Sequence, residues 1–185
     1  MPAERSHDGS WEEEIFALLD DLESRAEAGF AADREAELAD RSRTEYGEVT
    51  LAARLMASVG AELALTVRGV GLLRGVLERV AGGWLQLAAD GQDWVVRHQA
   101  IAALTGASDR AVPEIAWPAV ARLGVASALR RLADSGERCV LHLLDGTRRE
   151  GELRRVGADF VEVDDEGRLT LVALAALAAV QRREN

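Results

Sequence analysis

The residues with the clearest capacity for ligand chemistry are Arg97, His98 and Gln99, which stand side by side between two strand-like segments. An arginine can contact a phosphate, and a histidine can stack on a base or hydrogen-bond to it, so the triplet could line a groove for RNA. Trp94, three residues earlier, could add a stacking surface. The alternative is a polar turn between two strands, and we favour that alternative.

Four arginines within residues 148–155 form a second basic group, but two glutamates alternate with them. We favour cross-strand ion pairs on a solvated face over phosphate contacts.

No arrangement of residues predicts catalysis. The three histidines, His7, His98 and His142, are scattered, and no cluster of His, Cys and carboxylates has the spacing of metal ligands. The sequence also lacks a nucleophile elbow, a phosphate loop and a dinucleotide-binding fingerprint. We therefore expect no enzyme activity, no catalytic residue, no cofactor and no metal.

The charge of the chain points to protein partners more than to nucleic acid. The net charge is −10, and residues 1–61 carry fifteen acids against six arginines. An acidic segment of this kind repels nucleic acid and suits a protein surface or solvent. The remainder is close to neutral, without the basic footprint of a strong nucleic-acid binder.

The single cysteine, the N-terminus and the arginine content indicate the cellular compartment and the source of the protein. Cys139 is the only cysteine, which favours a reducing cytoplasm. The N-terminus has no apolar signal-peptide core, and the longest apolar run, residues 169–180, is too short to span a bilayer. We expect a cytoplasmic protein without membrane contact. All basic side chains are arginine and none is lysine, which is typical of a GC-rich genome, and we expect an actinobacterial source.

The elements that must position these residues follow from periodicity. Ser10 and Glu13 form a capping box, and apolar residues then recur at helical spacing, which predicts an acidic helical arm over residues 1–47. Short helices are expected at 48–59 and 119–134. From residue 62 the period changes to two, as in strands. Strand-like segments occur at 62–68, 72–80, 83–89, 93–98 and 100–104, and again at 138–144, 148–156, 159–164, 168–173 and 177–181.

An internal repeat relates these two sets of strands at an offset of 76 residues. Without a gap, residues 49–105 align with 125–181, and 15 of the 57 pairs are identical. Gly75 and Gly151 correspond and lie within a long second strand, where a missing side chain permits the bend that a small barrel needs. Trp84 corresponds to Phe160, which favours a core position, whereas Trp94 is expected to be more exposed.

The element order resembles the Sm-like fold, the family of bacterial Hfq and of eukaryotic and archaeal Sm and LSm proteins. Residues 140–146, with the Gly151-Glu152-Leu153 that follows, look like the first Sm motif, and residues 96–101 look like the last-strand motif of Hfq. Other SH3-like small barrels, including PRC-barrels, share such patterns. The positions where the family holds RNA bases are Gly157 and Val161 here, so the resemblance carries RNA chemistry only to Arg97, His98 and Gln99.

We therefore predict an α+β, mostly β fold, with a long helical arm followed by two tandem five-stranded barrels of Sm-like or SH3-like type, each preceded by a short helix. The expected domains are 1–47 for the arm, 48–106 for the first helix and barrel, 107–118 for a linker, and 119–185 for the second helix and barrel.

The expected function is non-enzymatic binding or regulation through a protein partner or self-association, using the arm and the barrel edges. The resemblance implies the edges, because neighbouring Sm barrels pair through a late strand and build rings. Two barrels on one chain could satisfy one such pairing internally. The alternative is an RNA-binding or transcription-related Sm-like regulator that uses Arg97, His98, Gln99 and Trp94.

Overall fold

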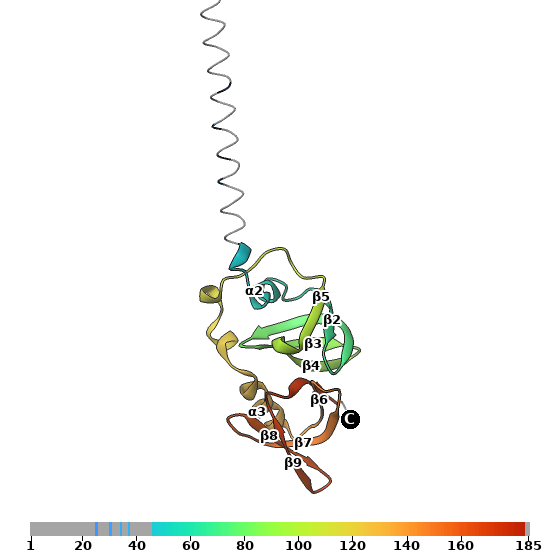
Figure 1. The fold of residues 1–185 in the computed structure, drawn as a ribbon. Helices are drawn as coiled ribbons and strands as arrows, with labels where there is room; N and C mark the ends of the chain where they lie inside the picture. The colour runs from blue at the N-terminus through green and yellow to red at the C-terminus, as the bar shows by residue number, and fades with distance from the viewer. Residues whose placement is uncertain (1–24, 26–29, 31–33, 35–36, 38–45, 184–185) are drawn as a thin grey trace, which may run out of the picture. The chain divides into compact units, whose positions relative to one another are not determined.

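The computed structural model describes residues 25, 30, 34, 37 and 46–183 (Figure 1). The chain divides into two compact units, Met1–Glu48 and Val49–Asn185. The helical arm predicted over residues 1–47 lies almost entirely outside the described residues. The described part of the chain contains no helix both long enough and apolar enough to cross a membrane.

The second unit is rich in β structure, and its strands lie within about two residues of the segments expected from periodicity. Its α-helices are shorter than expected. The first ends after six residues, and the second begins only after two 3₁₀ turns, one of three residues and one of four. The elements in chain order are α2 (Leu51–Met56), β1 (Glu62–Val67), β2 (Gly71–Ala81), β3 (Trp84–Ala89), β4 (Gln92–Arg97), η1 (His98–Ala100), β5 (Ile101–Thr105), η2 (Glu114–Ala116), η3 (Ala119–Arg122), α3 (Val125–Ser135), β6 (Arg138–Leu143), β7 (Arg148–Val156), β8 (Phe160–Asp165), β9 (Arg168–Ala173) and β10 (Leu177–Arg182).

The expected fold class is wrong, because the strands do not form two separate barrels. All ten belong to one antiparallel sheet in the order β5-β1-β2-β3-β4-β10-β6-β7-β8-β9, accompanied by two α-helices in the described residues. The sheets merge where β4 pairs with β10. Each of these strands would otherwise present a row of unpaired amides and carbonyls to water, and their pairing removes both edges.

Within this sheet, each half places its five strands in the same relative order. We call β1–β5 the first half and β6–β10 the second half. Adding 76 to the bounds of β1, β3 and β4 gives those of β6, β8 and β9, and β2 and β5 fit β7 and β10 within one residue. The registers also correspond: Leu63 faces Gly75 in the first half, and Cys139 faces Gly151 in the second.

The bends predicted at Gly75 and Gly151 are positions where the next strand crosses closely. A Cβ added to Gly75 would lie 2.0 Å from the carbonyl oxygen of Ala88, and one added to Gly151 would lie 2.4 Å from that of Asp164. Real side chains cannot occupy such distances. The two glycines therefore let the second strand of each half bend over the third.

Two apolar cores fill the unit, and each takes residues from both halves. The first core is built mainly on leucines and valines of β1–β4, and it includes Ala178 and Ala179 from β10. The second lies under α3, where Leu129 is fully buried, and it includes Ala81 and Trp84 from the first half. Separating the halves would expose apolar surface in both cores.

The loop between β1 and β2 also crosses from the first half to the second. Gly69 has a φ of +76°, and its Cα lies so close to the carbonyl of Leu143, at the end of β6, that an added Cβ would be 1.9 Å from that oxygen. A side chain at this position would force the loop and β6 apart.

We predict that Gly69→Ala destabilises the fold through this contact. Gly91 is the matched control, because its φ is +74° and its Cβ would meet nothing within 4 Å. Gly91→Ala should cost about 1 kcal/mol from backbone strain alone, and Gly69→Ala at least about 2 kcal/mol more from the collision. Urea unfolding of the two variants measures the difference, and equal losses would contradict the close approach.

Candidate functional site

The predicted RNA-contacting triplet lies at the joint between the two halves. Arg97 ends β4, and the 3₁₀ turn η1 that follows packs against the turn between β9 and β10. The Arg97 Nη1 donates a hydrogen bond to the carbonyl oxygen of Leu174 at 2.8 Å, and the Gln99 Nε2 donates to that of Ala175 at 3.3 Å. Two of the three side chains thus bind the backbone of the second half, which agrees with a polar turn that has a structural task.

Both tryptophans of the first half are buried. Trp84 is 6 % exposed, and its Nε1 donates to the carbonyl oxygen of Leu123 at 2.9 Å, so its predicted core position is confirmed. Trp94, which we expected to be more exposed, is 7 % exposed because its ring packs on His142, with the ring centroids 5.2 Å apart. Neither ring is free to stack on a base.

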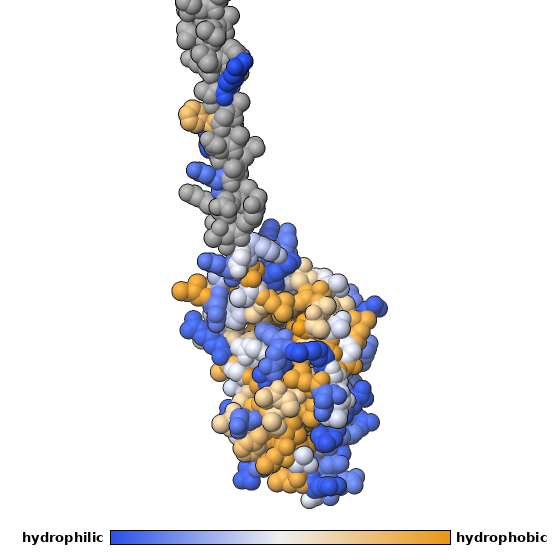
Figure 2. Space-filling model, in the orientation of Figure 1, coloured by the Kyte–Doolittle hydropathy of each residue, from blue (hydrophilic) through white to orange (hydrophobic). Residues whose placement is uncertain are grey.

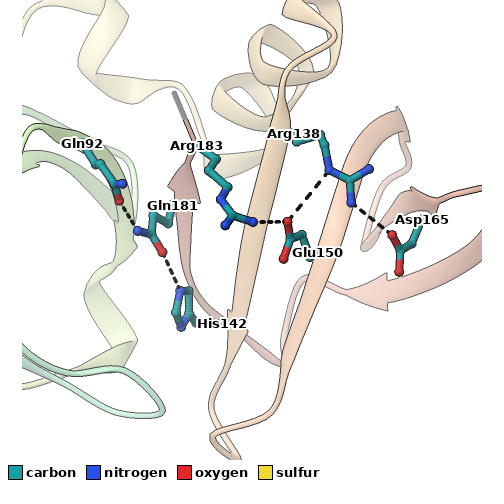
Figure 3. A network of polar contacts seen from close by, with 7 residues as sticks. All are labelled: Gln92, Arg138, His142, Glu150, Asp165, Gln181 and Arg183. Atoms are coloured by element: carbon teal, nitrogen blue, oxygen red, sulfur yellow. Dashed lines mark hydrogen bonds and ion pairs between the residues drawn. The ribbon is translucent and has the colours of Figure 1, made fainter. Parts of the chain in front are cut away.

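A chain of polar contacts continues across the joint from the Trp94–His142 pair (Figure 3). The Nε2 of His142 lies 3.3 Å from the Oε1 of Gln181, and the amide of Gln181 in turn donates to Gln92 on β4. His142 is 2 % exposed, and burial lowers the pKa of its imidazole, so the ring is neutral at pH 7. The sequence pattern placed His142 on a strand, but it did not predict this series of hydrogen bonds, which joins β4, β10 and β6.

Ion pairs reinforce the same joint on its other face. Arg182 on β10 pairs with Glu137, and its Nη1 also lies 3.5 Å from the Oδ2 of Asp93 on β4. Because these three residues come from both halves, the arginine bridges them electrostatically. Partly exposed pairs of this kind add little free energy individually, but they fix the register of the strands they join.

The arginines of residues 148–155 divide into two groups. Arg154 pairs with Asp164, and Arg155 pairs with Glu162 through two hydrogen bonds, so the predicted cross-strand ion pairs are confirmed for these two. The Arg154 guanidinium lowers the pKa of Asp164. Arg148 and Arg149 remain exposed. Nearby, Glu150 forms ion pairs with Arg183 and with Arg138, whose Nε lies 3.9 Å from the Glu150 Oε1. The Nη2 of Arg138 also lies 3.1 Å from the Oδ1 of Asp165 (Figure 3).

The described residues show no arrangement for covalent or metal chemistry. Cys139 is buried, and burial raises the pKa of its thiol to about 11, so the thiolate is not available at neutral pH. Within residues 46–183 and the few described before them, no group of three His, Cys, Asp or Glu side chains could hold a metal ion.

The two ends of the sheet have open edges. Strand β5 pairs only with β1, and β9 pairs only with β8, so each has one side without a partner in the part of the chain that is described. Leu169 and Leu171 on β9 are 54 % and 63 % exposed. On the face in Figure 2, hydrophobic residues lie between hydrophilic ones over the lower part of the unit, where Figure 1 shows α3, β8 and β9.

Comparison of the sequence with known protein families and with curated proteins finds no match.

The partial burial of His98 at the joint predicts a pH dependence of stability. The pKa of the His98 imidazole is lowered from 6.5 to about 4. Burial lowers it most, a hydrogen bond with the Trp84 backbone raises it, and the charge of Arg97 lowers it. In the unfolded chain the His98 imidazole binds a proton near pH 6.5, whereas in the folded chain it binds one only near pH 4. The free energy of unfolding should therefore fall as pH drops from 7 to 4, by up to about 3 kcal/mol from this residue.

Urea unfolding of the wild type and of His98→Gln between pH 4 and 7 measures the effect. The variant should show a shallower pH dependence whatever its stability at pH 7, because the level and the slope are separate readouts. Identical slopes would show that His98 is solvated in the folded protein.

Proposed function

We propose that this chain is a non-enzymatic interaction module of the bacterial cytoplasm, whose copies join by pairing β5 of one with β9 of another. The observation that carries the proposal is the β4–β10 pairing, in which the fourth strand of one half binds the fifth strand of the other. The proposal treats the halves as one duplicated module with the Sm-like resemblance described above. The remaining fourth and fifth strands, β9 and β5, are then the same pair of edges left open at the two ends of the sheet.

The internal joint supplies the register for the external one. In the joint, Val96 faces Ala179 and Val95 faces Val180. Moving the β4 residues forward by 76 positions and the β10 residues back by 76 places Val172 opposite Ala103 of a second copy, and Leu171 opposite Leu104. The exposed Leu171 would thus cover an apolar partner on β5, and both rows of unpaired backbone groups would be satisfied.

The sequences of the two edges support this correspondence. Strand β5 reads Ile-Ala-Ala-Leu-Thr, and the aligned part of β10 reads Leu-Ala-Ala-Val-Gln. Both place two small alanines at the centre, where a partner strand approaches, and a branched apolar side chain beside them. An edge that matches an already paired strand so closely presents a similar surface to a partner.

The external joint lacks the polar contacts that hold the internal one. The residue corresponding to Arg97 is Ala173, which has no guanidinium to donate to a neighbour's turn, and the residue corresponding to Asp93 is Leu169. The counterpart of Gly69 is Asp145, so the loop after β6 must shift to avoid the collision that a Cβ would cause. We therefore expect association between copies to be reversible and dependent on concentration, whereas the internal joint stays closed.

The first test of this proposal is the solution mass of the full chain. Sedimentation velocity should show the average mass rising with protein concentration. Leu171→Arg should keep the chain monomeric, because it places a charge on the open edge. Leu72→Arg is the matched control, because Leu72 is 57 % exposed on β2, a strand already paired on both sides.

The register has its own test. Leu104→Cys with Leu171→Cys should form a disulfide between copies under mild oxidation, whereas Ala102→Cys with Leu171→Cys should not, because these positions are out of register. Monomers at every concentration, or equal behaviour of Leu171→Arg and the wild type, would overturn the proposal. A third outcome would also overturn it: the native protein purifies with nucleic acid, as its absorbance ratio shows, and gains mass only when RNA is present. That result would favour RNA binding instead.

A further inference from the structure

A crevice lies between helix α3 and the outer face of the first half of the sheet. Its volume is about 340 Å³, which falls in the range of small-molecule sites. One wall is the sheet, where Arg79, Gln86, Val95 and Val180 form a row across β2, β3, β4 and β10. The crevice is thus built where the two halves meet, and it exists only because β4 and β10 are paired.

The other wall is helical and mainly aliphatic. Ala128 and Leu132 line it from α3, and Val120 and Leu123 line it from η3 and the residue after it. Val120 is 51 % exposed and Leu123 is 46 % exposed, so part of this apolar surface remains in contact with water. Apolar surface that faces a concave space in this way gains free energy when a ligand covers it.

The charges at the mouth of the crevice give the ligand its sign. Five charged side chains line it, and Arg182 is already engaged with Glu137 and Asp93, as described above. Arg79 and Arg131 are exposed, and neither has a hydrogen bond or ion pair within the described residues. An anionic group at the mouth would therefore meet two guanidinium groups without an ion-pair partner in the described part of the chain, whereas the lining acids Asp93 and Glu137 are already paired with Arg182.

We propose that this crevice binds an unbranched medium-chain carboxylate, such as a free fatty acid of about ten carbons, with its chain between α3 and the sheet and its carboxylate at Arg79 and Arg131. The aliphatic lining suits a flexible alkyl chain, and the volume admits a small ligand. A helix of a protein partner, with a diameter of about 10 Å or more, does not fit in such a space. This inference is independent of the proposed association through β5 and β9.

The test uses the full chain and two probes of equal length, decanoate and decanol, in isothermal titration below the concentration at which decanoate forms micelles. Decanoate should bind with saturation at one site per chain, and at least about tenfold more tightly than decanol, because only decanoate engages the arginines. Arg79→Gln with Arg131→Gln should remove that difference and leave decanol binding unchanged. Arg74→Gln is the matched control, because Arg74 is an exposed arginine on β2 that does not line the crevice.

Two filling variants test the location. Ala128→Phe should abolish binding of both probes by occupying the space. If the phenylalanine prevents folding, the smaller filling variant Ser127→Leu takes its place, and it should abolish binding of both probes in the same way. Equal affinity for decanoate and decanol would overturn the proposal, as would binding to a folded filling variant at the wild-type level or the absence of saturable decanoate binding.

Discussion

The hydrogen bonding between β4 and β10 is the interaction on which the rest of this structure depends. It turns two five-stranded halves into one sheet and removes two exposed edges that would otherwise invite unspecific pairing. Trp94 and His142 stack beside this joint, and Ala178 and Ala179 enter the core of the other half. Because burial in both cores requires the joint, its geometry also decides which residues are available to ligands.

The joint explains why the residues best suited to RNA contact are engaged elsewhere. Arg97 and Gln99 donate to carbonyl oxygens of the second half, and Trp94 is covered. Other arginines, including Arg79, Arg131, Arg148 and Arg149, remain exposed away from the joint. The open edges and the crevice under α3 are therefore the surfaces on which our two proposals rest.

The two halves differ at the positions that hold the β4–β10 joint together. The first half has Arg97, Asp93 and Gly69 there, whereas the positions 76 residues later in the second half are Ala173, Leu169 and Asp145. Each difference removes either a charged hydrogen bond or room for a close approach. The halves share strands and bends, whereas the residues that hold the first half to the second at β4 and β10 differ from those at the corresponding positions of the second half.

The sequence by itself determined the strands, their lengths, the glycine bends and the correspondence of the halves. These depend on alternation and turn residues within a few positions of one another, as at Gly75 and Gly151. Only the tertiary structure decided that β4 meets β10, that Trp94 and His142 are buried, and that α3 covers a crevice on the first half. Those contacts join residues that are far apart in the sequence, such as Trp94 with Gln181 and with His142, and they depend on the fit between two whole surfaces, which no local pattern encodes.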